Sequence, residues 1–253
     1  MDIYYMIVLF IFGTILGSFY NVVGDRLPEG KSIVKPSSHC PKCGHKLTPL
    51  ELIPIFSYLI QKGRCKGCNT KIPIMHPLFE FMSGLLFMLA YISFKLSPEL
   101  LIALTFISIL LIIFISDIEY MIIPDEVLIV GIILLVIEKF CIHGLKPLLI
   151  SLLDGTICFI LMYLLKKFGD FLFKKESMGG GDIKLMFIFG FVLGTPMAIM
   201  SIFIGSIIGL PISLIVLSKN ASHEIPFGPL LSLGALIILL TKFNFDKFLG
   251  LFS

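Results

Sequence analysis

The sequence predicts an all-α polytopic membrane protein with about eight transmembrane helices and a small cytoplasmic zinc-binding domain between the first and the second. Three observations lead to this fold class. The 253 residues are 57% hydrophobic and only 15% charged, whereas about a quarter of the residues in a soluble domain are charged. Apolar runs long enough to cross the ~30 Å hydrocarbon core of a bilayer recur along the chain. Four cysteines fall in the one long polar segment, residues 24–76.

The apolar runs define eight expected spans. The first has no basic residue before it and no small-residue cleavage site after it, so we expect a retained helix rather than a cleaved signal. The sixth is short and ends at Gly194-Thr195-Pro196, which predicts either a partial span or one arm of a tight helical hairpin. The eight spans are residues 3–23, 77–95, 99–116, 124–141, 147–168, 182–194, 196–218 and 226–243.

The basic residues predict the orientation. Alternate loops belong to alternate sides, and one side holds 15 of the 20 Lys and Arg residues. Such a side is cytoplasmic by the positive-inside rule, which places the N-terminus outside and both Asp117 and Asp182 at the cytoplasmic face. The basic side consists of residues 24–76, 117–123, 166–181 and 219–225, together with Lys184.

This topology divides the chain into a first transmembrane helix (1–23), a tetracysteine domain (24–76) and a transmembrane bundle (77–253). The tetracysteine domain is too short to be held together by core burial alone, so a metal or disulfides are expected. It contains Cys40-Pro-Lys-Cys43 and Cys65-Lys-Gly-Cys68, with 21 residues between the pairs. Two such turns supply four thiolates for a tetrahedral structural Zn²⁺.

Alternatives to this zinc site remain open at the level of sequence. The thiols can instead be free or form two disulfides, although disulfides are rare in the cytoplasm. His39 and His45 stand beside the first pair and can replace a cysteine as ligand.

Two acids stand at the ends of long apolar runs. Asp117 closes the run 100–116, and Asp182 follows Gly179-Gly180-Gly181 and opens the run 183–193. A carboxylate at the edge of hydrocarbon is costly and marks a functional site. Two carboxylates that share one proton can activate water and polarise a scissile carbonyl, and glycines permit close approach of the backbone. The pair therefore predicts hydrolysis at a membrane face; the alternative is two interface residues at helix ends, favoured at 182 by the helix dipole.

Other charged residues compete with this pair. Asp125, after Pro124, begins the fourth span on the same face and is a candidate third member of the site. Lys184 is two residues past Asp182, on the opposite helix face, and either anchors at the interface or tunes the acid. Asp154 lies some 20 Å from the cytoplasmic edge of its span, too far to join the pair; a bond to Ser or Thr of a neighbouring helix is expected.

Four separated motifs resemble, in order, the type IV prepilin leader peptidases, which are membrane aspartyl peptidases of the GxGD class. The motifs cover almost the whole chain. They are Gly17-Ser-Phe-Tyr-Asn-Val-Val-Gly-Asp-Arg-Leu-Pro28, the two cysteine pairs, Asp117 with Pro124-Asp125, and Gly179-Gly180-Gly181-Asp182-Ile-Lys184.

This resemblance implies that Asp117 and Asp182 are the catalytic residues and that Asp125 belongs to the motif without that role. The implied substrates are prepilin or pseudopilin precursors in a prokaryotic cell membrane. Their short basic leader, ending in Gly, would be cut just before an apolar helix. A second implied activity is N-methylation of the new N-terminus, with S-adenosylmethionine as donor, in the cysteine domain that peptidase-only relatives lack.

The residues themselves support methyl transfer less directly, because no glycine-rich dinucleotide-type fingerprint is present. Glu80 and residues 17–28 are the nearest candidates for a donor site, and no donor-binding residue is assigned. No nucleic-acid partner is expected. Two alternative functions are a transporter or proton-relay protein with a regulatory zinc domain, and a non-enzymatic assembly platform for secretion or pili.

Overall fold

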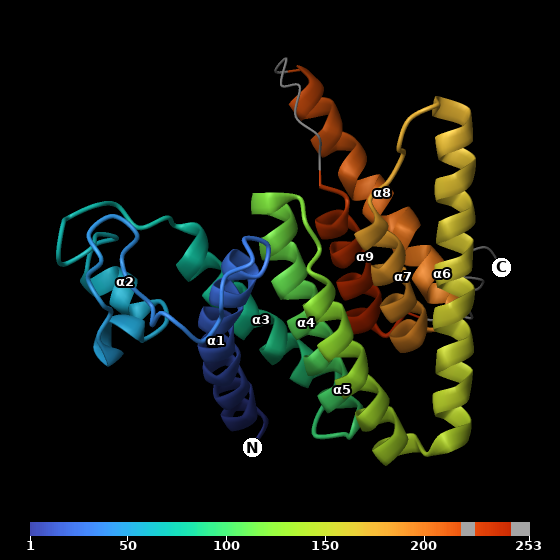
Figure 1. The fold of residues 1–253 in the computed structure, drawn as a ribbon. Coiled ribbons are helices and arrows are strands. Elements are labelled where there is room, and N and C mark those ends of the chain that lie inside the picture. The colour runs from blue at the N-terminus through green and yellow to red at the C-terminus, as the bar shows by residue number, and fades with distance from the viewer. Residues whose placement is uncertain (219–225, 244–253) are drawn as a thin grey trace. The chain divides into compact units, whose positions relative to one another are not determined.

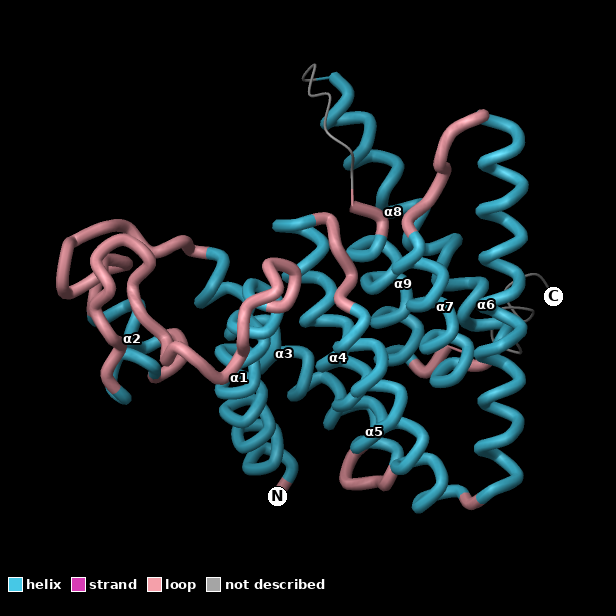
Figure 2. Tube along the Cα trace, in the orientation of Figure 1, coloured by secondary structure: helices cyan, strands magenta, loops and turns pink. Residues whose placement is uncertain are grey.

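The computed structural model describes residues 1–218 and 226–243, coloured along the chain in Figure 1. The predicted loop 219–225 and Lys247 lie outside the described residues. Over the described ranges the elements are helices joined by loops (Figure 2), and strand-like pairing is limited to two isolated bridges, His39–Lys46 and Arg64–Lys71. The predicted all-α class is therefore confirmed.

Each of the eight predicted apolar segments is a helix in the structure. Five of these helices, α1, α3, α4, α6 and α8, are long and apolar enough to cross a membrane, so the protein is a multi-pass membrane protein. α7 and α9 have only 14 residues each. The eight helices are α1 (Asp2–Arg26), α3 (Met75–Phe94), α4 (Glu99–Tyr120), α5 (Asp125–His143), α6 (Leu145–Phe173), α7 (Gly180–Leu193), α8 (Thr195–Ser218) and α9 (Gly228–Thr241).

The chain forms two compact units, Met1–Leu96 and Ser97–Ser253. In the first unit, α1 and α3 pack closely through small residues. A Cβ added at Gly17 would stand 2.9 Å from the Cα of Glu80, and one at Gly84 would stand 2.8 Å from the carbonyl oxygen of Phe10. Glycine permits this approach of two membrane helices because it has no side chain between the backbones.

The cysteine domain is joined to this helix pair at two points. The Asn21 side chain of α1 donates to the carbonyl of His76 in α3 over 3.1 Å. The chain therefore enters and leaves the cysteine domain at neighbouring points. The Glu80 carboxylate of α3 accepts the N–H of Ile55 over 2.7 Å. Ile55 has φ +63° and ψ −54° and precedes α2 (Phe56–Ile60), so a carboxylate of the helix pair holds a tight turn of the domain.

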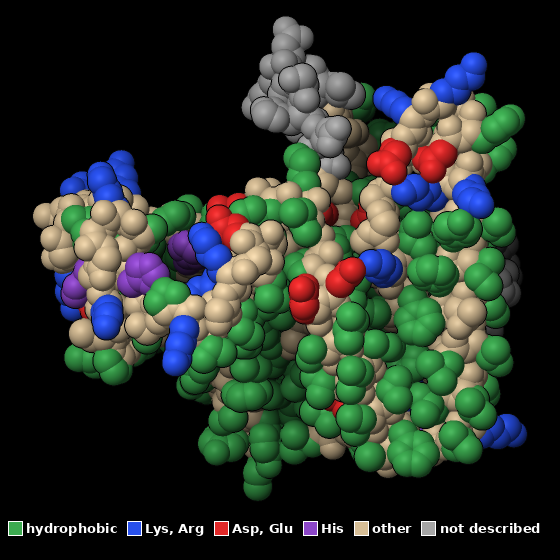
Figure 3. All heavy atoms as spheres, viewed as in Figure 1, with side chains coloured by type: hydrophobic (Ala, Val, Ile, Leu, Met, Phe, Trp, Pro, Cys, Tyr) green, Lys and Arg blue, Asp and Glu red, His purple; other side chains and the backbone are tan. Residues whose placement is uncertain are grey.

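In the second unit α4 is the central helix. Many of its side chains between Leu100 and Asp117 are buried. Phe106 packs edge-on against Phe189 of α7, with ring centroids 5.7 Å apart. α6 instead exposes large apolar side chains such as Leu153 and Leu164, as a lipid-facing helix does. Figure 3 shows charged side chains gathered mostly at one end of this unit, with hydrophobic side chains covering the helices beyond it.

Candidate functional site

Asp117 occupies the last turn of α4 at the charged end of the second unit, and its side chain is buried, with 6% of the residue exposed. The helix ends because Met121 adopts a left-handed conformation, with φ +54°, while its N–H bonds the carbonyl of Asp117 over 3.0 Å. The Ser116 hydroxyl donates to the carbonyl of Ile122 over 2.6 Å. These bonds fix the turn that leads from Asp117 to α5.

Asp182 lies in the first turn of α7, after the N-terminal cap residue Gly179, and is also buried, with 8% exposed. The glycine before it faces that same turn: a Cβ added at Gly181 would stand 2.8 Å from the Cβ of Ile123. The start of α7 therefore packs directly against the segment that follows α4, so the structure brings the two predicted motifs together.

A third segment reaches Asp117 from the C-terminal part of the chain. The N–H of Gly228, at the start of α9, donates to Oδ2 of Asp117 over 3.1 Å in a buried position. A Cβ at residue 228 would stand 2.6 Å from the same oxygen. Gly228 was not among the residues predicted from the sequence; the signal that marks it is the turn Pro226-Phe-Gly-Pro229 before the last apolar run.

The two carboxyl groups therefore share one end of the bundle. Each is buried, and the neighbouring glycines Gly181 and Gly228 both pack against Ile123. Two interacting carboxyl groups titrate as a pair, because the second charge is disfavoured once the first has formed. Such a pair can accept a proton from water and donate one to a carbonyl oxygen, which are the two tasks of acid–base hydrolysis.

The remaining candidates of this region have other contacts. Both Asp125 oxygens, on the first residue of α5 after Pro124, lie 2.7 Å from Nζ of Lys184 on α7. Lys184 therefore points to α5 and not to Asp182. Asp154 accepts the hydroxyl of Thr195 over 2.6 Å, as expected from its depth.

The four cysteines of the first unit form one cluster, whose sulfur atoms all lie within 4.8 Å of one another. Cys40 and Cys68 sulfurs are 3.8 Å apart, and Cys43 and Cys65 sulfurs are 3.9 Å apart. A tetrahedron with Zn–S bonds of ~2.3 Å has sulfur–sulfur edges of about 3.8 Å. The cluster therefore fits a structural metal ion, and all four thiols are free of disulfide bonds.

Neither histidine beside the first pair belongs to this cluster. His39 bonds the carbonyl of Ser37 over 2.8 Å, and His45 approaches Glu51 at 3.3 Å. Glu51 is buried and also accepts the N–H and hydroxyl of Thr48. These bonds, followed by those from His45 and the charge of Lys66, lower the pKa of Glu51 to about 2, so an ionised acid ties the two cysteine turns together.

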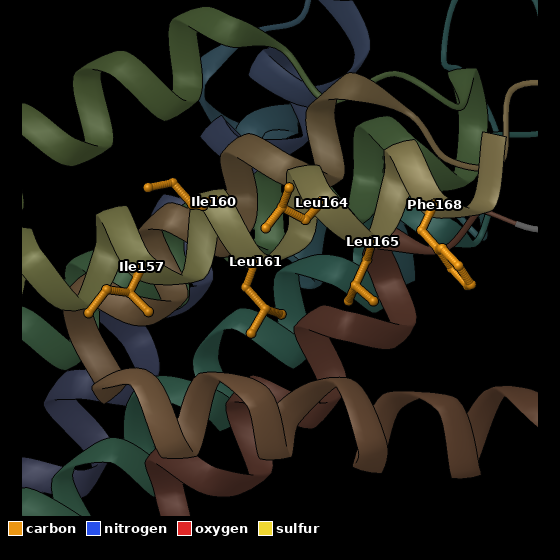
Figure 4. A pocket seen from close by; sticks show the side chains of 6 residues that line it. All are labelled: Ile157, Ile160, Leu161, Leu164, Leu165 and Phe168. Carbon is orange, nitrogen blue, oxygen red and sulfur yellow. The ribbon is translucent and has the colours of Figure 1, made fainter. Parts of the chain in front are cut away.

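An apolar hollow of about 460 Å³ lies on α6. Its walls are side chains of α6 alone (Figure 4), and none carries a titratable group. It is part of the apolar surface of that helix and offers no chemistry. The lining residues are Ile157, Ile160, Leu161, Leu164, Leu165 and Phe168.

The fold and the site together indicate the class of protein, a multi-pass membrane enzyme with two buried acids at one end of a helical bundle. Residues 11–94 match the family model of the bacterial peptidase A24 N-terminal domain, and residues 104–214 match that of the type IV leader peptidase family. The chain belongs to the type IV leader peptidase family.

Curated relatives are similar in sequence to this chain over most of its length. A prepilin leader peptidase/N-methyltransferase of Bacillus subtilis (strain 168) is 38% identical over 233 residues, which are 91% of this chain and 92% of the relative. A protein of the same name in Neisseria gonorrhoeae is 31% identical, covering 90% and 87%. A type 4 prepilin-like proteins leader peptide-processing enzyme of Escherichia coli O78:H11 is 31% identical, covering 88% and 89%. The comparison with solved structures gave no match.

Proposed function

We propose that the chain is an aspartyl endopeptidase that cleaves the leader of type IV prepilin-like precursors after Gly, with Asp117 and Asp182 as its catalytic residues. The observation that carries this proposal is the burial of both acids at one end of the same helical unit. The names of the relatives supply the substrate class.

In this mechanism the carboxyl pair holds one proton. The ionised member takes a proton from water while the water oxygen attacks the scissile carbonyl, and the protonated member donates to the carbonyl oxygen. The tetrahedral intermediate then collapses: the C–N bond breaks, the leaving nitrogen takes the proton that came from water, and a hydroxyl proton of the intermediate returns to the other carboxylate. The N–H of Gly228 fixes the orientation of Asp117. The close packing of Gly181 on Ile123 brings the start of α7 to the turn after α4, so the two acids approach the substrate from separate helices.

We further propose that the enzyme N-methylates the exposed N-terminus with S-adenosylmethionine as methyl donor, an activity carried by the first unit. The match of residues 11–94 to the family's N-terminal domain and the printed names of the relatives support this role. Cys40, Cys43, Cys65 and Cys68 would hold Zn²⁺. A closed four-sulfur site supplies folding energy and leaves no coordination position for a reactant.

The proposed setting is a prokaryotic cell membrane with the N-terminus outside and the acid pair at the cytoplasmic face. The positive-inside distribution of Lys and Arg supports this orientation. The partners are precursor substrates and lipid. The transporter alternative expects acids spaced through the bilayer; Asp154, the deeper acid on which it rests, is bonded to Thr195.

The test measures cleavage of a prepilin-like precursor by Asp117→Asn and Asp182→Asn, each compared with Glu119→Gln. Glu119 is an exposed acid in the segment between Asp117 and Pro124. Both aspartate variants should lose cleavage by a factor of about 10⁴ or more, since neither half of the pair works alone, while Glu119→Gln cleaves normally. Full cleavage by either aspartate variant would show that the proposed catalytic pair is wrong.

A further inference from the structure

α7 carries Asp182 in its first turn but is too short to cross a bilayer. Its 14 residues extend over about 21 Å at ~1.5 Å per residue, against ~30 Å of hydrocarbon. With its start at the cytoplasmic face, as proposed above, α7 therefore ends inside the membrane. Carbonyl groups in a last helical turn have no donor within the helix, and in hydrocarbon they have no water either.

Lys139 of α5 supplies a donor at this end. Its Nζ bonds the carbonyl oxygen of Phe191, in the last turn of α7, over 2.5 Å, and the hydroxyl of Ser151 over 2.5 Å. It also stands 4.7 Å from the centroid of the Phe191 ring. A cation at a helix C-terminus is favourable on dipole grounds, whereas an unpartnered lysine at this depth is costly. Both partners are therefore stabilised by the contact.

The turn that follows is held by α6. Gly194 has φ +82°, and the next residue, Thr195, donates its hydroxyl to Asp154 over 2.6 Å. A Cβ added at Gly190 would stand 2.6 Å from the carbonyl oxygen of Asp154, so α6 and α7 are in backbone contact here. The membrane-embedded end of α7 is thus fixed from two helices.

The other end of α7 is bonded to α5 through Asp125 and Lys184. Asp125 and Lys139 are 14 residues apart, which places them within about 40° of one another around α5. Lys184 and Phe191 are seven residues apart, within about 20° around α7. One face of α5 therefore contacts one face of α7 near both ends.

We propose that these two contacts, the α5 tether, set the depth and rotation of α7 and thereby the position of Asp182 relative to Asp117. Asp125 and Lys139 are then positioning residues, an assignment that rests on the proposed function of the acid pair. The Phe191 contact is nine residues, or roughly 13 Å, from Asp182, and the helix transmits a shift at one end to the other. A displacement of about 1 Å at a reacting group can cost a hundredfold in rate.

The test of the membrane-embedded contact compares Lys139→Met, Lys139→Arg and Lys146→Met in the full chain. Lys146 is an exposed lysine in the first turn of α6 and serves as the matched control. Lys139→Met should lower kcat about tenfold with KM unchanged, and Lys139→Arg, which keeps the donor, should restore it. The assignment is wrong if Lys139→Arg has the same low kcat as Lys139→Met, or if Lys146→Met loses as much kcat as Lys139→Met.

The contact between Asp125 and Lys184 is exposed, so charge reversal tests it without disturbing the bundle interior. Asp125→Lys and Lys184→Asp should each lower kcat, and the double variant should recover it. Amide hydrogen exchange in residues 182–191 should quicken in each single variant and slow again in the double. If the double variant is no better than the singles, the tether is refuted. If Asp117→Asn or Asp182→Asn still cleaves, the proposed function fails instead, and the exchange result is unaffected.

Discussion

At the scale of the residue, Gly180 and Gly181 are neighbours with different surroundings. A Cβ at 180 meets nothing within 4 Å, whereas a Cβ at 181 would stand 2.8 Å from the Cβ of Ile123. Contacts below about 3 Å between such atoms force the backbone to move, because the base of a side chain cannot rotate away. Only the second glycine is therefore required by the packing of α7 on the turn after α4.

This difference predicts that Gly181→Ala damages cleavage far more than Gly180→Ala. The alanine at 181 should push the start of α7 away from Ile123 and displace Asp182, lowering kcat/KM by up to about a hundredfold. Steady-state cleavage of a precursor peptide by both purified variants measures the ratio. Equal losses in the two variants would show that the motif's glycines act through backbone freedom and not through this contact.

Asp117 and Asp182 were predicted from the cost of an acid beside an apolar run, a signal local to each position. The local sequence marks Gly228 only as a turn residue. Its contact with Asp117 spans 111 positions of the chain and exists only after α9 has packed on α4. The partner of Lys184 was unpredictable for the same reason. Helical spacing shows that Lys184 faces away from Asp182, but not that α5 stands on that side.

At the scale of the element, the cysteine domain consists of two similar tight turns joined by short helices. Each turn has a bond from the N–H of the residue after the second cysteine to the carbonyl of the first: Gly44 to Cys40, and Asn69 to Cys65. The connecting segment contains η1 (Pro49–Leu52) and α2, neither long enough to be stable alone. The four sulfurs are therefore the main link between the turns.

Serine at any one of positions 40, 43, 65 or 68 should remove the metal and unfold this domain, because metal-binding energy in such small domains is folding energy. We expect about one Zn²⁺ per chain in the wild type and methylation lost with the metal, while leader cleavage persists. Metal content by elemental analysis and the mass of the product's N-terminus report the two effects. Undiminished zinc in all four variants would exclude the tetrahedral site.

The helices themselves were predicted well, since every expected apolar segment became a helix with ends within a few residues. The shortness of the sixth segment was predicted as well, but the contacts that hold its end were not. The sequence shows that residues 182–194 are mostly apolar. The contacts at the end of this short helix come from Lys139, which bonds the carbonyl of Phe191, and from Asp154, which bonds Thr195 in the turn that follows. Hydropathy measures each segment in isolation and contains no information on such contacts.

At the scale of the whole molecule, the two compact units coincide with the two family models. The N-terminal model covers residues 11–94 and the peptidase model residues 104–214, and the units divide at residues 96 and 97. Both proposed catalytic acids lie in the second unit and the whole cysteine cluster in the first. This separation supports two activities that can be lost independently.

Replacement of residues 28–73 by a short Gly-Ser linker should leave cleavage intact and abolish both zinc binding and methylation. The helix pair is already closed at this point by the bond from Asn21 to His76 and by the glycine contacts below it. The product's N-terminus and the thermal stability of the purified protein are the measurements. A folded variant that no longer cleaves would show that the domain contributes to the peptidase.

The bond between Asn21 and His76 closes the base of the hairpin that α1 and α3 form. A helical hairpin that is closed at its own base can acquire or discard whatever lies between its arms without being rebuilt. The cysteine domain then has the character of an insertion, tolerated because entry and exit are side by side. One deletion between the arms would remove it, and a different module could be grafted at the same place.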